Sequence, residues 1–334
     1  MKLRAVNLGG WFVLERWMKQ SLFTQTKEGC NDETCFSELT PDKEKVLEEH
    51  YMTWIIKDVI LWLKEQGVNL VRIPIPWWLY GEVGYHRSVE ALTEALVMID
   101  DIGIDFMLDL HTAPGCQNGF DNGGIQYVMD WHKDPKNIDK TIEILTDVMT
   151  EFNEFSHFHS IQLLNEPGVG IPLDIIQDFY IRAYNQLRLI HPTRYIVMHD
   201  GFRLHKWESF FTSNKFQHVI LDTHMYQCFD HSQYDYTIEQ HCEATHKRTK
   251  VLEQIEQFVP VVVGEWSLGL RMNGFLKQND NDENLRKYAT AQLQAMRACT
   301  GHIFWSYKVS EDFSGWNFRK LVERNVIDMK EFCQ

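Results

Sequence analysis

Short apolar runs alternate with longer segments of mixed polarity along the whole chain. Eight of these runs are apolar enough to predict parallel strands that are buried on both faces. The predicted strands are Ala5–Leu8, Val68–Ile73, Asp105–Asp109, Ile161–Leu164, Tyr195–Met198, Val219–Asp222, Val261–Val263 and Ile303–Trp305.

The segments between these strands carry apolar residues at helical spacing. In Thr53–Gln66 the apolar residues recur on one face, and Gly67 follows as a residue suited to a helix end. Val89–Ile102 stops at Gly103 in the same way. Further predicted helices are Lys136–Phe155, Leu173–Ile190, Thr245–Phe258 and Glu283–Cys299.

Eight alternations of strand and helix favour an α/β fold of the (β/α)8 TIM-barrel type, in one domain spanning residues 1–334. No internal repeat or low-complexity tract divides the chain. A doubly wound sheet is the structural alternative. Such a sheet usually carries a glycine-rich phosphate loop after its first strand, but Gly9-Gly10-Trp11 does not continue as G-x-G-x-x-G.

Composition narrows the range of partners. The formal net charge of −14 argues against nucleic acid as a binding partner. The sequence contains no run of about 18 apolar residues, so we expect no membrane-spanning helix. No apolar stretch follows Lys2 and Arg4, so we expect a cytoplasmic protein; secretion is the alternative if a signal has been removed. The seven cysteines lack zinc-like spacing, which favours reduced thiols and no metal, while pairing of Cys30 with Cys35 stays open. The 11 tryptophans fit either sugar stacking or a Trp-rich core.

Polar residues follow the apolar strands at the end where a barrel places its active site. The segments concerned are Arg72-Ile73-Pro74, Asp109-Leu110-His111, Asn165-Glu166-Pro167, His224-Met225-Tyr226, Gly264-Glu265-Trp266 and Phe304-Trp305-Ser306. Glu166 and Glu265 lie on predicted strands four and seven, so they should face each other across the mouth. Glycoside hydrolysis needs two carboxyl groups that flank the scissile bond. A single glutamate at a strand end could instead serve a helix N-terminus or a salt bridge.

These motifs resemble glycoside hydrolase family 5, and within it the exo-β-1,3-glucanase subgroup. The resemblance covers nearly the whole chain. It is carried by Val6–Glu15, Val71–Ile75, Leu108–His111, Ala113–Asn122, Leu163–Pro167, Gly264–Ser267 and Phe304–Tyr307. The Asn-Glu-Pro motif is shared by a wide clan of barrel glycosidases, whereas the opening segment and Gln117–Asp121 are specific to the subgroup.

The resemblance implies a catalytic role for each polar residue at the mouth. Glu166 would be the acid/base, with a raised pKa in the free enzyme, and Glu265 the nucleophile. Asn165 would bind the sugar 2-hydroxyl group. Arg72 and Tyr226 would keep Glu265 ionised and oriented. His111 and His224 would complete the pocket around the reacting sugar, although a histidine at such a position is also commonly a satisfied core residue.

The resemblance also implies how the terminal sugar is held. Glu15 and Asp121 would bind the hydroxyl groups at its far end, which closes the pocket behind one glucose. Trp305 would form the stacking floor. Phe120 and Phe229 would flank the entrance, where the next sugar lies. Met272–Phe275 would line outer sugar sites, and the diverged segments Gln25–Phe36 and His231–Lys250 leave the linkage preference open.

We therefore predict a retaining double-displacement hydrolysis of β-1,3-gluco-oligosaccharides from their non-reducing ends, with no cofactor. A β-glycosidase of other specificity would use the same two glutamates on another β-glucoside, such as a β-1,6-glucoside, a disaccharide glycoside or a glycolipid. A non-catalytic carbohydrate-binding barrel is the alternative from another class. A phosphoglycosidase is disfavoured, since no cluster of Lys, Arg and Ser is evident for a sugar phosphate.

Overall fold

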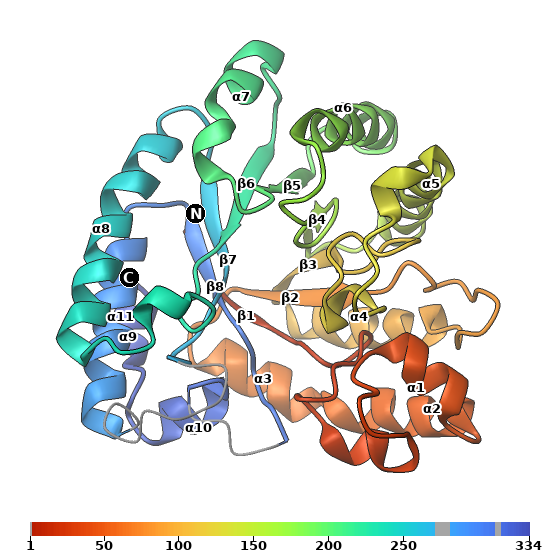
Figure 1. Ribbon diagram of the computed structural model, residues 1–334, viewed down its shortest axis with the longest axis horizontal. Coiled ribbons are helices and arrows are strands. Elements are labelled where there is room, and N and C mark those ends of the chain that lie inside the picture. Colours follow the sequence, from red (N-terminus) through yellow and green to blue (C-terminus); the bar gives the residue numbers. More distant parts are fainter. Residues whose placement is uncertain (1, 271–280, 311–314) are drawn as a thin grey trace.

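The computed structural model describes residues 2–270, 281–310 and 315–334. Eight parallel strands pair in sequence order and close on themselves, because β1 pairs with both β2 and β8 (Figure 1). The strands are β1 (Leu3–Asn7), β2 (Leu70–Ile75), β3 (Asp105–Leu110), β4 (Phe158–Gln162), β5 (Tyr195–His199), β6 (Val219–His224), β7 (Val261–Trp266) and β8 (Gly301–Phe304). The predicted barrel is confirmed, and the predicted strand ends differ from these by no more than three residues.

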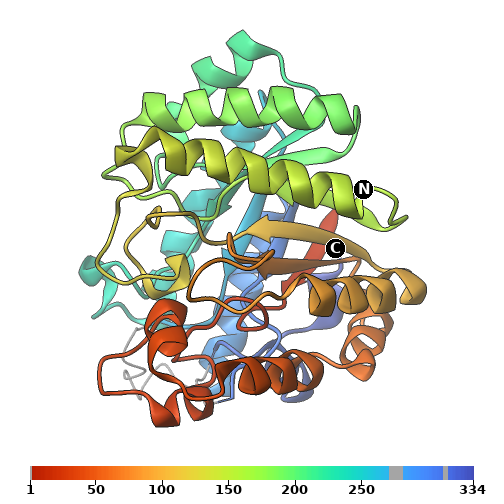
Figure 2. The same cartoon turned by 90° about the vertical axis from the view of Figure 1, so that its right-hand side faces the viewer.

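Helices surround the barrel. They are α1 (Glu33–Leu39), α2 (Lys43–Trp54), α3 (Lys57–Glu65), α4 (Val89–Ile102), α5 (Pro135–Phe152), α6 (Leu173–Ile190), α7 (Glu208–Asn214), α8 (Ile238–Glu256), α9 (Asp282–Met296), α10 (Phe318–Glu323) and α11 (Met329–Phe332). Figure 2 shows α5 and α6 side by side along the barrel, and they pack against each other. In the described part of the chain, no helix combines the length and apolarity needed to cross a membrane.

The predicted helix Thr53–Gln66 is wrong. The chain breaks there, since α2 ends at Trp54 and α3 begins at Lys57. Ile55 and Ile56 adopt extended backbone conformations between the two helices. The break has a packing reason, because the Trp54 indole Nε1 donates to the Gly9 carbonyl (2.9 Å) and fixes the end of α2 against the loop after β1. By contrast, the predicted bounds of α4 and α6 are confirmed.

Inside the barrel, side chains alternate along each strand and form layers. The lower layer is apolar and consists of Leu3, Ala5, Leu70, Met107, Val197, Ile220, Val262 and Ile303. Two residues further along most strands, the next inward position is buried and polar: Asn7, Arg72, Asp109, Gln162, His199 and Asp222. The apolar layer fills the barrel near the N-terminal ends of the strands. The polar layer lies above it, at the C-terminal ends, and forms the floor of the mouth.

Strand β7 departs from regular alternation just before its end. Thr223 pairs with Val263 and His224 pairs with Glu265, so Gly264 has no partner on β6. Since Val262 points into the barrel, strict alternation would point Glu265 outward. The irregularity reverses this, as a β-bulge does, and brings Glu265 into the mouth. A Cβ at Gly264 would lie 2.1 Å from Asp222 Oδ1, so glycine is required there.

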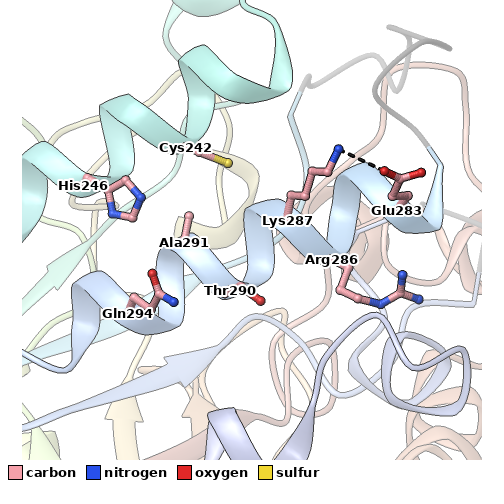
Figure 3. Close-up of a pocket in the computed structure, with 8 residues that line it drawn as sticks. All are labelled: Cys242, His246, Glu283, Arg286, Lys287, Thr290, Ala291 and Gln294. Carbon is pink, nitrogen blue, oxygen red and sulfur yellow. Dashed lines mark ion pairs between the residues drawn. The ribbon is translucent and has the colours of Figure 1, made fainter.

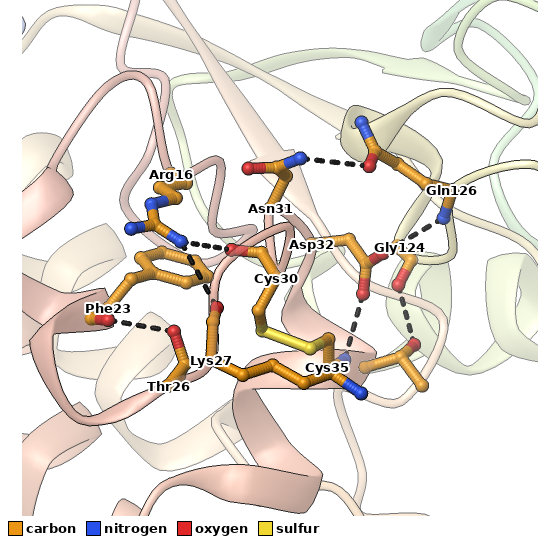
Figure 4. The surroundings of a disulfide bond; sticks show 11 residues. Arg16, Phe23, Thr26, Lys27, Cys30, Asn31, Asp32, Cys35, Gly124 and Gln126 are labelled. Carbon is orange, nitrogen blue, oxygen red and sulfur yellow. Dashed lines mark hydrogen bonds between the residues drawn. A yellow bond between two sulfur atoms is a disulfide. The ribbon is translucent and has the colours of Figure 1, made fainter.

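A disulfide joins Cys30, in the loop that leads into α1, to Cys35 in the first turn of that helix (Figure 4). The prediction that all seven cysteines are reduced is therefore wrong for this pair, whose Cα atoms lie 5.6 Å apart. Disulfides are typical of oxidising surroundings, so this bond removes the argument that led from reduced thiols to the cytoplasm. The cellular compartment stays a prediction.

Candidate active site

Glu265, at the end of β7, is held by two hydrogen-bond donors. Arg72 Nη1 donates to Oε1 (3.0 Å), and the Tyr226 hydroxyl donates to Oε2 (2.8 Å). The carboxyl group is almost completely buried. These are the two partners expected from the sequence, and together they fix the orientation of the carboxylate.

Arg72 is itself fixed on four further side chains and cannot turn away from Glu265. Its guanidinium is fully buried and in contact with carboxylate or amide oxygens on every nitrogen. The acceptors are Asn7 Oδ1 (2.8 Å), Gln162 Oε1 (3.0 Å), Asn165 Oδ1 (2.9 Å) and Asp109 Oδ2 (3.1 Å). The sequence reasoning did not assign Asn7 or Gln162 to the site. A count of inward strand positions beyond the apolar layer would have indicated them.

Glu166 lies in the loop after β4 with a left-handed backbone (φ 46°). Its Oε1 contacts His224 Nδ1 at 2.7 Å, and its Oε2 accepts from Asn122 Nδ2 at 2.9 Å. Such a conformation is uncommon for a residue other than glycine and occurs chiefly at functional sites. Asn122 ends one of the segments that carry the family resemblance, Ala113–Asn122, but was not predicted as a site residue.

His224 joins the two glutamates. Its Nδ1 also lies 3.4 Å from Glu265 Oε2, while its Nε2 lies 3.2 Å from Asp222 Oδ2. Burial disfavours a charged imidazole, but the nearby carboxylates of Glu265 and Asp222 outweigh it and raise the pKa of His224 well above its usual value. The surroundings of His224 therefore favour its charged form between the two glutamates.

The expected raised pKa of Glu166 is wrong for this free state. Burial favours the neutral acid, but the hydrogen bond and the charge of His224 prevail and lower the pKa of Glu166 to about 2. For Glu265, burial prevails over His224 and Arg72, and the pKa is raised. The two directions favour protonation of the imidazole of His224 over protonation of Glu166.

Glu166, His199 and His224 place one potential metal ligand each within 4.8 Å of one another. The Nδ1 atom of His199 lies 2.9 Å from the Gly201 backbone N–H and accepts from it. The hydrogen of neutral His199 is then on Nε2, which makes this atom a donor rather than a metal ligand. We interpret the group as a hydrogen-bonding cluster, and the absence of a metal cofactor stays a prediction.

Two other carboxyl groups, Glu15 and Asp121, lie close enough to influence each other. Burial, and then the charge of Asp121, raise the pKa of Glu15 well above its usual value, although the Trp17 indole donates to Oε2 (2.8 Å). Burial also raises the pKa of Asp121. The structure brings together this predicted pair, which comes from two loops separated by more than 100 residues.

Aromatic and imidazole rings complete the predicted pocket. His111 stacks on Trp305 with ring centres 5.5 Å apart, and its Nδ1 contacts Asp109 Oδ2 at 2.5 Å. Behind Trp305, the space for a Cβ on Gly9 is filled by the indole. Trp305 is therefore held rigidly between the loop after β1 and His111.

Phe120 and Phe229 are half-exposed, as expected of rings that flank an entrance. Phe229 packs against Tyr226 (5.3 Å between centres) and near Trp316 (6.5 Å), a residue that the sequence reasoning did not assign to the site. The predicted outer-site segment Met272–Phe275 lies outside the described residues.

A separate hollow of about 440 Å³ lies between α8 and α9 (Figure 3). Cys242 and His246 line it from α8, while Glu283 and Lys287 pair with each other on the α9 side (3.0 Å). It contains none of the predicted site residues. The charges at the mouth, and not this hollow, mark the candidate active site.

Comparisons with known proteins agree with this geometry. Residues 38–311 match the family model described as Cellulase (glycosyl hydrolase family 5). The chain is 31% identical to the probable glucan 1,3-beta-glucosidase A of Emericella nidulans, over 97% of this chain and 89% of that protein. It is 30% identical to the glucan 1,3-beta-glucosidase of Candida oleophila, over 98% and 88%.

Among solved structures, the rutinosidase from Aspergillus niger superimposes with a TM-score of 0.83 over 98% of both chains. Its sequence is only 18% identical, so this likeness concerns the fold. The family model, by contrast, covers most of the sequence, and the two buried glutamates lie within the matched range. The chain therefore belongs to glycosyl hydrolase family 5 and is a glycoside hydrolase.

Proposed function

We propose that the protein is a retaining exo-β-1,3-glucanase that releases glucose from the non-reducing ends of β-1,3-gluco-oligosaccharides, with Glu166 as acid/base and Glu265 as nucleophile. The observation that carries the proposal is the position of His224 Nδ1, which lies 2.7 Å from an oxygen of Glu166 and 3.4 Å from an oxygen of Glu265. One nitrogen touches both carboxyl groups, so the pair is close and jointly held.

This closeness supports a retaining mechanism. Inverting glycosidases separate their carboxyl groups by roughly 6.5–9.5 Å to leave room for a water molecule, whereas retaining enzymes separate them by about 5–5.5 Å. Two oxygens that share one nitrogen at 2.7 and 3.4 Å cannot be as far apart as the inverting range requires. Glu265 is then near enough to attack the anomeric carbon directly.

In the first step, Glu265 forms a bond to the anomeric carbon while the bond to the leaving oxygen breaks and that oxygen takes a proton from Glu166. Arg72 and Tyr226 hold Glu265 at the position of attack. The 2.7 Å contact between His224 and Glu166 is the path by which His224 can supply this proton to Glu166 before the leaving group departs. Loss of the charge on Glu265 during attack favours this transfer, because His224 then loses a neighbouring anion.

In the second step, Glu166 removes a proton from water, and the water oxygen replaces Glu265 on the anomeric carbon. Two inversions restore the β configuration. Asn165, fixed by Arg72 at 2.9 Å, is positioned to bind the 2-hydroxyl group, where contacts strengthen in the transition state.

The exo character rests on Glu15 and Asp121. Glu15 is buried and Asp121 is partly exposed, and their carboxyl groups are the hydrogen-bonding partners proposed for the far end of the terminal glucose. A pocket closed at that end accepts one sugar and cannot bind the middle of a chain. The β-1,3 linkage is proposed from the names of the relatives, since both relatives named above are described as glucan 1,3-beta-glucosidases.

Anomer-resolved NMR during hydrolysis of laminaritriose tests the proposal. We expect β-glucose and laminaribiose as the first products, with no turnover by the Glu265→Gln variant. Early α-glucose would contradict the role of Glu265 as nucleophile. If laminaritriose is inert but another β-glucoside is cleaved with retention, the β-1,3 preference is wrong and the catalytic assignment stands.

A further inference from the structure

Residues 30–35, here named the brace segment, lie between the loop that carries Glu15 and the loop that carries Asp121 (Figure 4). We propose that the brace segment sets the separation of these two carboxyl groups, with Asp32 as its positioning residue and the Cys30–Cys35 disulfide as its covalent support. The inference rests on the proposed function, in which Glu15 and Asp121 bind the terminal sugar.

On one side, the brace segment holds the backbone on both flanks of Glu15. The N–H of Leu14 donates to Glu33 Oε2 (2.8 Å), and the N–H of Arg16 donates to the Asn31 carbonyl (3.1 Å). Glu15 itself forms an isolated antiparallel bridge with Asp32. With both neighbours fixed, the backbone of Glu15 cannot shift without breaking bonds to the brace segment.

On the other side, the brace segment holds the chain that follows Asp121. The N–H of Gln126 donates to Asp32 Oδ2 (3.0 Å), and Asn31 Nδ2 donates to the Gln126 side-chain oxygen (3.1 Å; Figure 4). The N–H of Thr34 donates to the Gly124 carbonyl (3.1 Å). Asp121 begins the short 3-10 turn that ends directly before Gly124, so these bonds restrain its position.

Asp32 is the residue that both sides require. One carboxylate oxygen accepts from the N–H of Cys35 (2.8 Å) at the start of α1, and the other accepts from Gln126. The side chain is buried, and a carboxylate can accept at both oxygens, whereas an amide has one oxygen and one donor group. Asparagine at this position would therefore lose one of the two bonds and leave a partly buried N–H without its partner.

The disulfide joins the two ends of the brace segment. Cys30 also accepts from Arg16 Nη1 at its carbonyl (3.1 Å), so the bond connects the Glu15 side to the first turn of α1. Such a restraint matters because Glu15 and Asp121 are like groups in a buried place and repel each other when ionised. Two hydroxyl-binding groups must be held within about 0.5 Å of their productive positions to act together.

The test compares p-nitrophenyl β-glucoside with p-nitrophenyl β-xyloside, which lacks the hydroxymethyl group at the far end of the ring. We expect Asp32→Asn to lower kcat/KM for the glucoside on the order of tenfold, the loss of about one hydrogen bond, while the xyloside, which offers one hydroxyl group fewer at that end, loses clearly less. The Cys30→Ser/Cys35→Ser double variant should show the same selective loss. Dithiothreitol should reproduce it in the wild-type protein and have no effect on the double variant.

Cys242→Ser is the matched control, since it changes a cysteine outside the disulfide and should respond to dithiothreitol as the wild type does. Equal losses on both glycosides, or none in Asp32→Asn, would overturn the inference. If Asp32→Asn does not fold, the effect of dithiothreitol on the wild-type glucoside-to-xyloside ratio decides. A wild-type protein inert on every β-glycoside would instead contradict the proposed function.

Discussion

At the catalytic end of the pocket, the carboxyl groups lie against cations, whereas at the terminal-sugar end they do not. Glu265 contacts Arg72 and Glu166 contacts His224, and both cations come from strands. Within the described residues, neither Glu15 nor Asp121 forms an ion pair, and both come from loops. The carboxyl groups that react thus lie against cations, while the carboxyl groups that only bind hydroxyls are held by the surrounding backbone.

The largest effect should come from removing the nucleophile. Glu265→Ala should lower kcat by on the order of 10⁴-fold or more, because no other group attacks the anomeric carbon. Added azide should restore slow reaction and give the α-glucosyl azide, since it enters from the face that Glu265 vacates. Glu166→Ala should instead give the β-glucosyl azide from an activated aryl glucoside. An exchange of these two products would reverse the assignment.

Arg72→Met should destabilise the fold by about 3–5 kcal/mol, because Asp109 and Glu265 are left as buried charges without their partner. Urea unfolding measures this difference. Lys133→Met is the matched control, since its pair with Asp130 is exposed and should contribute less than about 1 kcal/mol. Equal losses in the two variants would show that burial of the charge does not distinguish the catalytic end.

Glu15→Gln should retain activity within about tenfold at neutral pH, in contrast to the same substitution at Glu265. The reason is that burial and Asp121 raise the pKa of Glu15 and favour its neutral form, which glutamine resembles. Steady-state kinetics on an aryl glucoside measure the difference, with Glu15→Ala as the variant that removes the hydrogen-bonding group. A loss as large as that of Glu265→Gln would show that Glu15 must be ionised.

The smallest expected effect is a shift of the pH profile. Glu265 must be ionised to attack, and its pKa is raised. As the pH is lowered, activity should therefore begin to fall at a higher pH than it would with an ordinary glutamate as nucleophile. The proton on His224 is lost as pH rises through its own raised pKa, which sets the alkaline limb. Tyr226→Phe removes a donor to Glu265 and should move the acidic limb of kcat/KM upward by about one pH unit. If the acidic limb does not move in Tyr226→Phe, ionisation of Glu265 does not determine that limb.

The difference between the two ends also explains what the sequence could predict. Strand ends meet at the mouth of any barrel, so Arg72, Glu166 and Glu265 could be assigned to one site from their order along the chain. Residues that contact this site, such as Asn7, Gln162 and His199, were missed. A single polar residue inside a short apolar run gives no pattern that distinguishes it from a chance occurrence. They become visible only when inward and outward positions are counted separately.

The loop region was less predictable for a physical reason. Glu15 and Asp121 could be named only through the family resemblance, since no periodicity relates two loops that meet in space. The Cys30–Cys35 bond was not expected, because cysteine spacing alone does not distinguish a thiol pair from a disulfide. The predicted direction of the pKa shift of Glu166 was wrong, because this shift depends on the exact position of His224, which a sequence does not give.

The bulge at Gly264 limits how the active site can vary. Any side chain there would enter the space of Asp222, whose oxygens accept from Gln162 and from the Gly264 N–H and contact His224. A mutant library randomised at this codon and screened for turnover should therefore return glycine almost alone, although residue 264 has no side chain to offer a substrate. Active variants of this enzyme should therefore differ in the loops around the pocket, whereas the position directly before the nucleophile should tolerate no substitution.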